Sequence, residues 1–182
     1  MVPAPPAYAG SMVSPRPDAT GAHPALAGAP APARDSSRVA PAARTVVRAE
    51  VTREAVDPAD LAREVGRTTA GAVVTFSGVV RDHDLGRTVT GIEYVAHPSA
   101  PEVMAAVVAD VAARSDVDAV AAVHRVGDLG IGDCALAVAV AAAHRAEAFA
   151  AASALVDEVK HRLPVWKRQE FPDGTDEWVA CP

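Results

Sequence analysis

Lysine is nearly absent from this sequence, which carries its positive charge almost entirely as arginine. Of the 17 basic residues in the 182-residue chain, 15 are arginine and two are lysine, Lys160 and Lys167. Arginine keeps its proton in proteins, whereas a lysine amine can be tuned to act as an acid, base or nucleophile. The two lysines are therefore candidate catalytic residues, and the alternative is chance in a lysine-poor composition.

The sequence also lacks net positive charge and long hydrophobic runs. Its formal net charge is −6 and its pI about 5.4, which argues against nucleic acid as a partner and restricts any anion site to a local cluster. The sequence has no run of about 18 apolar residues, so we expect no membrane span. We also expect no secretory signal. Although only 4% of residues are aromatic, half are hydrophobic, which suffices for one core.

Cysteine is scarce as well, with Cys134 in an apolar segment and Cys181 near the end. Two cysteines exclude a disulfide framework and favour a reducing cytoplasm. The histidines and cysteines show no zinc spacing. We expect no metal and no cofactor. The glycine-rich segment 127–132 lacks the Lys-Ser/Thr of a phosphate-binding loop and is predicted to be a hairpin turn.

The distribution of proline divides the chain. Residues 1–43 hold nine of the fifteen prolines and show no periodicity, which predicts a disordered tail before a domain over 44–182. Asp57 and Pro58 predict a helix start, and Ser99 with Glu102 predicts a capping box. The patterns predict an α+β fold, a mixed antiparallel sheet with a few packed helices. Strands are expected at 45–51, 71–80, 91–97, 118–126, 134–142 and 177–180, and helices at 58–65, 99–114 and 145–163, with a loop at 81–87.

The last predicted helix carries Lys160. At 100° per residue, Lys160 falls within a stripe formed by Phe149, Ser153, Val156 and Leu163, which we expect to be buried. In a pocket, desolvation would favour the neutral amine, which is suited to proton transfer or nucleophilic attack. The alternative is a lysine that extends to solvent near the helix end.

Further candidates lie where predicted elements end. Pro164 turns the chain after the helix, so Lys167 can return toward Lys160, with Trp166 as a pocket wall or core residue. Arg81 ends one strand, and a guanidinium can bind a phosphate through two hydrogen bonds. His144 and Arg145 precede a helix start, which favours anions. The alternatives are a cap for His144, and solvated surface positions for the arginines and Lys167.

In their order and spacing, these residues resemble the catalytic subunit family of molybdopterin synthase. The resemblance covers residues 44–180 and is carried by several segments: 71–83, 124–127, 132–133, 143–145 with Phe149, Lys160, and 164–168. It implies an α/β-hammerhead-like fold and a transferase in molybdenum cofactor biosynthesis. The implied substrate is cyclic pyranopterin monophosphate. The implied sulfur donor is a thiocarboxylate on the C-terminal glycine of a small ubiquitin-like subunit.

The resemblance also implies a role for each matched residue. Lys160 would assist sulfur transfer, and Lys167 would assist ring opening or hold the intermediate. A dimer of large subunits within a heterotetramer is implied, with His144 and Arg145 supplied across the dimer interface. The substrate-binding set is Arg81, His144, Arg145, Lys160, Lys167, Arg168 and Gln169, and the pocket wall is Phe76, Val156 and Trp166.

Three departures from the family pattern bear on substrate affinity. Val79 replaces a common basic residue, Gln169 replaces a common acidic one, and the chain ends at Pro182 without further basic residues. Two other functions fit the same residues: a lyase that uses Lys160 as a Schiff base, and a non-catalytic module that docks a ubiquitin-like protein.

Overall fold

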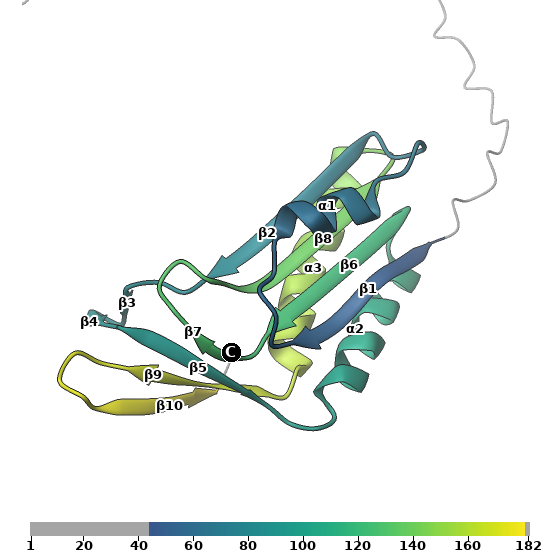
Figure 1. Cartoon of the computed structure of the whole chain (residues 1–182). Helices are drawn as coiled ribbons and strands as arrows, with labels where there is room; N and C mark the ends of the chain where they lie inside the picture. Colours follow the sequence, from purple (N-terminus) through teal and green to yellow (C-terminus); the bar gives the residue numbers. More distant parts are fainter. Residues whose placement is uncertain (1–43, 181–182) are drawn as a thin grey trace, which may run out of the picture. The chain divides into compact units, whose positions relative to one another are not determined.

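The computed structural model describes residues 44–180, so the predicted tail over residues 1–43 lies outside the described residues. Strands and helices alternate irregularly, which confirms the α+β prediction (Figure 1). The elements are β1 (Thr45–Thr52), α1 (Pro58–Val65), β2 (Ala72–Val79), β3 (His83–Asp84), β4 (Arg87–Thr88), β5 (Gly91–Ala96), α2 (Ala100–Arg114), β6 (Ala119–Arg125), β7 (Gly127–Leu129), β8 (Cys134–Ala142), α3 (Arg145–Arg162), β9 (Val165–Glu170) and β10 (Asp176–Ala180).

The first sheet has the strand order β1-β6-β8-β2. Strand β1 runs parallel to β6, and the other neighbours pair antiparallel. The central strands β6 and β8 are alanine- and valine-rich and buried along almost their whole length, because helices cover both faces of the sheet. Small side chains let the helices approach closely, which explains how a chain poor in aromatics builds a dense core.

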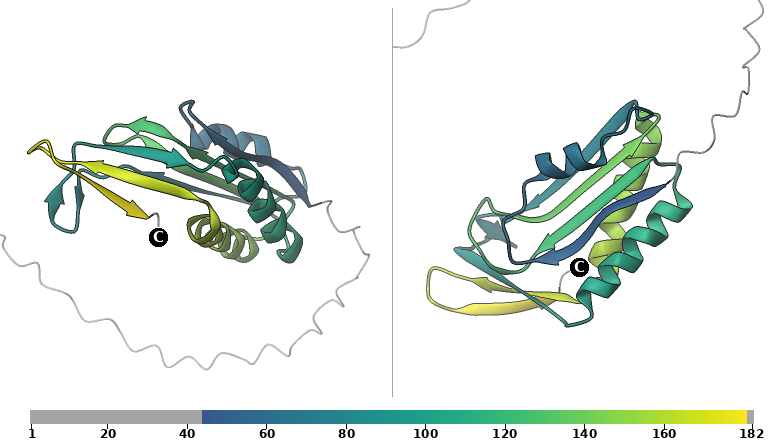
Figure 2. Two further views of the ribbon diagram at one scale, coloured as in Figure 1. Left: turned by 90° about the horizontal axis from the view of Figure 1, so that it is seen from below. Right: turned by 45° about the vertical axis from the view of Figure 1, so that its right-hand side comes forward.

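The helices form two layers on this sheet. Helices α2 and α3 pack side by side on one face, where Val120, Val138 and Leu155 belong to the largest apolar cluster (Figure 2). Helix α1 covers the other face through Leu61 and Val65. As predicted, Asp57 caps α1 by accepting a hydrogen bond from the Ala59 N–H. No helix within residues 44–180 is long and apolar enough to cross a membrane.

The second sheet is antiparallel, with the strand order β10-β9-β5-β7. Strand β9 was not predicted, because two apolar residues are followed by four charged or polar ones, Lys167–Glu170, and this order lacks the alternation that marks a strand. It begins directly after α3, where Pro164 ends the helix. The Pro164 carbonyl accepts a hydrogen bond of 3.0 Å from the His97 N–H, which secures the start of β9 beside the end of β5.

Two short strands lie within the predicted loop 81–87. Strands β3 and β4 form a tight hairpin whose turn residues, Leu85 and Gly86, have φ angles of 47° and 81°. Positive φ at both central positions characterises the type I′ turn that suits two-residue hairpins. The loop prediction was therefore too coarse: this segment is an ordered projection of the domain, with the Leu85 side chain almost fully exposed at its tip.

Two further predictions need correction. Residues 127–132 are more than a turn, because Gly127–Leu129 forms β7 and pairs with β5. The capping box does not form at α2: Ser99 makes no side-chain cap, and its hydroxyl lies 2.8 Å from the His97 Nδ1 instead. A competing local hydrogen bond of this kind is a frequent alternative for serine near a helix start.

The buried stripe of α3 differs from the predicted one. The helix buries Ala148, Ala151, Ala152, Leu155 and Val159, whereas Phe149 is 62% exposed and Lys160 is exposed. The prediction was wrong because it followed the largest apolar side chain. The true stripe has the same helical spacing but uses mostly alanines, which fit against the closely packed sheet.

The buried stripe of α3 predicts very different effects for two substitutions on this helix. Leu155→Ala removes a fully buried side chain and should lower the free energy of unfolding by about 2–5 kcal/mol. Phe149→Ala should change it by less than about 0.5 kcal/mol, because the ring is exposed. Urea denaturation of both variants measures the difference. An equal loss from Phe149→Ala would show that the ring is covered in solution by another chain.

Candidate active site

A cavity of about 430 Å³ opens between the two sheets, at the end of β2 and the C-terminal end of α3. Cavities of this size are typical of small-molecule sites. Its walls come from segments far apart in the sequence. The lining residues are Phe76, Gly78, Val79, Val80, Arg81, His83, Asp84, Leu85, Val89, Ile92, Tyr94, His124, Ala135, Leu136, Lys160, Lys167, Gln169 and Val179.

The cavity brings together half of the ten residues predicted for the site. Phe76 and Arg81 come from β2 and its end, Lys160 from the last turn of α3, and Lys167 and Gln169 from β9. Both lysines of the chain thus line one cavity, although one lies on a helix and the other on a strand. Val79, noted in the sequence as an apolar departure, also lines it and is half exposed.

The two lysines have different surroundings. The Lys167 side chain is 16% exposed, and its Nζ lies 3.1 Å from the Asp84 Oδ2. Lys160 is exposed and makes no hydrogen bond or ion pair with any residue between positions 44 and 180. One amine is therefore held by a carboxylate, and the other is free to meet an incoming ligand.

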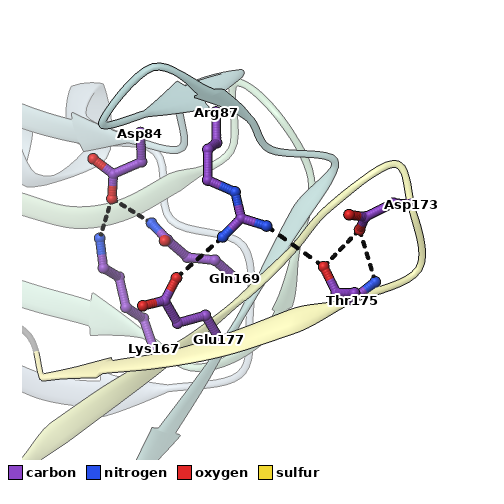
Figure 3. Close-up of polar contacts among 7 residues, drawn as sticks. All are labelled: Asp84, Arg87, Lys167, Gln169, Asp173, Thr175 and Glu177. Atoms are coloured by element: carbon purple, nitrogen blue, oxygen red, sulfur yellow. Dashed lines mark hydrogen bonds and ion pairs between the residues drawn. The ribbon is translucent and has the colours of Figure 1, made fainter.

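Asp84 joins three predicted site residues. Its Oδ2 also accepts a hydrogen bond from the Gln169 amide (Figure 3). Its Oδ1 lies 3.2 Å from the Arg81 Nη2. The hydrogen bonds from Gln169 and Lys167 lower the pKa of Asp84 below its ordinary value, so this carboxylate stays ionised. Asp84 was not predicted as a site residue, because Lys167 and Gln169, which place it at the cavity, are more than 80 residues away in the chain.

His124 is a second cavity residue that the sequence analysis did not select. It is 5% exposed, and its ring meets the Tyr94 ring edge-on with a centroid distance of 5.2 Å. Its Nδ1 lies 2.8 Å from the Arg125 carbonyl, which only accepts, so Nδ1 donates and the neutral ring leaves Nε2 unprotonated. Burial lowers the pKa of His124, which favours this neutral form.

Of the five predicted residues that do not line the cavity, three lie near it in the fold. Val156 packs against the main core. Trp166 and Arg168 flank Lys167 on β9, and successive side chains of a strand point to opposite faces, so both project away from it. Arg168 is engaged there: its Nη2 lies 2.7 Å from the Glu93 Oε2, and its guanidinium stands over the Trp178 ring.

His144 and Arg145 lie at the opposite end of α3 from Lys160. His144 occupies the N-cap position without a side-chain cap, and both side chains are exposed. Lys160 lies fifteen positions after Arg145 on this helix, which corresponds to about 22 Å at 1.5 Å per residue. Within one chain these two residues cannot reach the cavity, so a role there requires a second copy.

The charges of the cavity favour an anionic ligand. Arg81, Lys160 and Lys167 contribute three positive charges, and Asp84 contributes one negative charge. This local excess of positive charge contrasts with the net charge of −6 of the whole chain. Within residues 44–180, no three His, Cys, Asp or Glu side chains gather into a group that could hold a metal ion.

Comparison with known proteins identifies the family. The family model described as MoaE protein matches residues 51–162, which include β2, most of the cavity wall and Lys160. This chain belongs to the MoaE family. Its membership agrees with the resemblance found in the sequence, and the family match spans all three helices of the fold.

Individual relatives agree with this assignment. The molybdopterin synthase catalytic subunit of Thermoplasma volcanium is 35% identical over 130 residues, which cover 71% of this chain and 95% of the relative. The protein of the same name from Escherichia coli is 40% identical over 116 residues, covering 63% and 77%. The crystal structure of molybdopterin synthase from Staphylococcus aureus superposes with a TM-score of 0.67 at 28% identity, covering 71% of this chain and 95% of that one.

The buried His124 generates a prediction about pH. Because its pKa in the folded protein lies below the ordinary 6.5, the unfolded chain binds more protons as the pH falls past that value. Its contribution to stability is complete above about pH 6.5 and is lost as the pH falls toward the lowered pKa. Urea denaturation between about pH 7 and 5 should show a steeper loss for wild type than for His124→Gln.

The exposed His161 on α3 provides the control for this measurement. His161→Gln should keep the steeper loss of the wild type. Equal slopes for wild type and His124→Gln would mean that His124 is protonated as easily in the folded protein as in the unfolded chain.

Proposed function

We propose that this chain is the large, catalytic subunit of molybdopterin synthase and converts cyclic pyranopterin monophosphate to molybdopterin. The observation that carries the proposal is the position of the chain's two lysines, which line one cavity together with Arg81. Membership of the MoaE family and the names of the relatives support the same reaction. The reaction belongs to molybdenum cofactor biosynthesis, and its compartment is the cytoplasm.

The chemistry of both reactants suits this cavity. The substrate carries a phosphate, and the sulfur arrives as a thiocarboxylate at the C-terminus of a small ubiquitin-like subunit. Both groups are anionic and need cations in a protein whose net charge is negative. The exposed position of Lys160 at the cavity supports a meeting point for an incoming chain terminus and the bound pterin.

The contacts of each cation suggest its role. Lys160 has no carboxylate partner within residues 44–180, so its amine is available for acid–base or nucleophilic assistance in sulfur transfer. Lys167 is held by Asp84 and is suited to holding the intermediate during ring opening. Arg81 offers a guanidinium for the phosphate. Two rounds of transfer install the two sulfurs.

A second large subunit completes the proposed site. His144 and Arg145 are exposed at the far end of α3, about 22 Å along the helix from Lys160. Their proposed role in substrate binding is therefore played in the partner's cavity, within a heterotetramer of two large and two small subunits. We leave Arg168, Val156 and Trp166 out of the substrate contacts, because none of them lines the cavity.

A sulfur-transfer assay tests the function and the role of Lys160. Wild type, supplied with thiocarboxylated small subunit and cyclic pyranopterin monophosphate, should form molybdopterin. Lys160→Ala should lose at least about 100-fold in rate, the usual contribution of a positioned acid or base. Lys160→Arg should be equally impaired, because arginine supplies charge but does not release its proton. His161→Ala, which alters the next helix position outside the cavity, should keep the rate.

The outcomes separate the proposed enzyme from its two alternatives. Tight binding of the small subunit without product formation by wild type would favour a docking module. Trapping of a carbonyl substrate on Lys160 by borohydride, without any sulfur carrier, would favour a Schiff-base lyase. Full activity of Lys160→Ala would leave the function standing and remove Lys160 from the chemistry.

A further inference from the structure

One carboxylate connects three of the cavity's polar residues. Asp84 Oδ2 accepts hydrogen bonds from Lys167 Nζ and from the Gln169 amide, and both donors lie on the same face of β9 (Figure 3). Side-chain exposure is 21% for Asp84 and 16% for Lys167, and Gln169 is 4% exposed. Partial exclusion of water strengthens such a contact compared with a surface ion pair.

The hairpin that carries Asp84 is held in place by separate contacts. Arg87, across the turn, stacks on the Phe171 ring at 3.5 Å from its centroid. Its guanidinium also lies 3.3 Å from the Glu177 carboxylate and 3.5 Å from the Thr175 hydroxyl. Figure 3 shows the contacts of Arg87 with Glu177 and Thr175 beside those of Asp84. The position of the carboxylate therefore does not depend on Lys167 alone.

Lysine needs such a partner if it is to stay in one place. Its side chain has four flexible carbons, and fixing them carries an entropic cost that one directed contact can offset. The Gln169 amide donates to the same carboxylate oxygen and thereby restricts where the ammonium can sit. Lys160 has no comparable partner among the described residues, so the restraint is specific to Lys167.

We propose that Asp84 is a positioning residue for Lys167: its carboxylate, with Gln169, holds the ammonium group at the cavity wall in the geometry that turnover requires. This proposal rests on the function proposed above. It concerns the placement of an existing group, so Asp84 itself need not touch the substrate.

Because Asp84 is negatively charged, its removal should affect KM differently from general damage to the cavity. Removing a negative charge from a cavity that binds anions increases the attraction for an anionic substrate. A variant without the Asp84 charge should therefore bind substrate at least as well as wild type, while Lys167 loses its fixed position. Loss of positioning lowers kcat, whereas general damage to the cavity would raise KM.

Asp84→Asn is the first test, in the complete enzyme with thiocarboxylated small subunit. We expect kcat to fall by about 10- to 100-fold, the range that misplacement of a reacting group produces, with KM unchanged or lower. The matched control is Asp82→Asn on the same loop, because Asp82 pairs with His83 and has no contact with Lys167. The control should keep wild-type kcat. An unchanged kcat in Asp84→Asn, or a raised KM, would overturn the proposal.

Exchanging the carboxylate and the amide between positions 84 and 169 tests whether a carboxylate beside Lys167 is required or an aspartate at position 84. Gln169→Glu alone places two carboxylates side by side and should also lower kcat. The double variant Asp84→Asn/Gln169→Glu restores one amide and one carboxylate of the original sizes beside Lys167. It should recover most of the kcat that Asp84→Asn loses. If the double variant is as impaired as the single ones, the carboxylate is not the required feature.

A measurement without turnover separates this inference from the proposed function. The chain has two lysines, so lysine-selective isotope labelling gives two side-chain NMR signals, which Lys160→Arg assigns. Asp84→Asn should move the Lys167 signal and leave the Lys160 signal in place, and Asp82→Asn should move neither. If wild type makes no molybdopterin, the proposed function fails. If wild type is active and the Lys167 signal does not move, the positioning role of Asp84 fails alone.

Discussion

The turn at Pro164 is the constraint on which the cavity depends. Helix α3 ends at Arg162, two residues before Pro164, and β9 begins at Val165, with its start held to β5 by the hydrogen bond between His97 and Pro164. This abrupt reversal brings Lys167 back toward Lys160, which lies in the last turn of α3. A longer connection would leave the two amines on unrelated surfaces. The pairing of β9 with β5 then determines which side chains face the cavity and which face away.

The sequence predicts the first sheet and its helices well. In the second sheet it predicts β5 and β10 within one residue and misses β7 and β9. Long runs of β-branched and alanine residues locate β2, β6 and β8 within one or two residues. The misplaced stripe of α3 and the missed β9 share a cause, since periodicity depends on contrast between apolar and polar positions. Alanine gives weak contrast on α3, and β9 has a charged or polar residue at most positions. Tertiary packing, not local pattern, decides both.

The same distinction applies to the site. The rarity of lysine points to Lys160 and Lys167, and the end of a predicted strand points to Arg81. Neither signal depends on the residues that surround them in space. Once Lys167 is assigned to a strand, the alternation of side chains excludes its neighbours Trp166 and Arg168 from the same wall. Because the sequence does not reveal β9 as a strand, it does not exclude these two neighbours. Asp84 could not be inferred at all, because a two-residue strand carries no periodicity and Lys167 and Gln169 are distant in sequence.

The distribution of charge gives the two lysines different surroundings. An acidic chain that binds anionic reactants must gather cations locally, and cations in close proximity repel one another. A single carboxylate between Lys167 and Arg81 relieves that repulsion without occupying Lys160. The cavity therefore holds one amine whose position is fixed by its neighbours and one amine that is available to reactants. This difference matches the roles proposed for the two lysines, with Lys167 holding the intermediate and Lys160 assisting proton transfer.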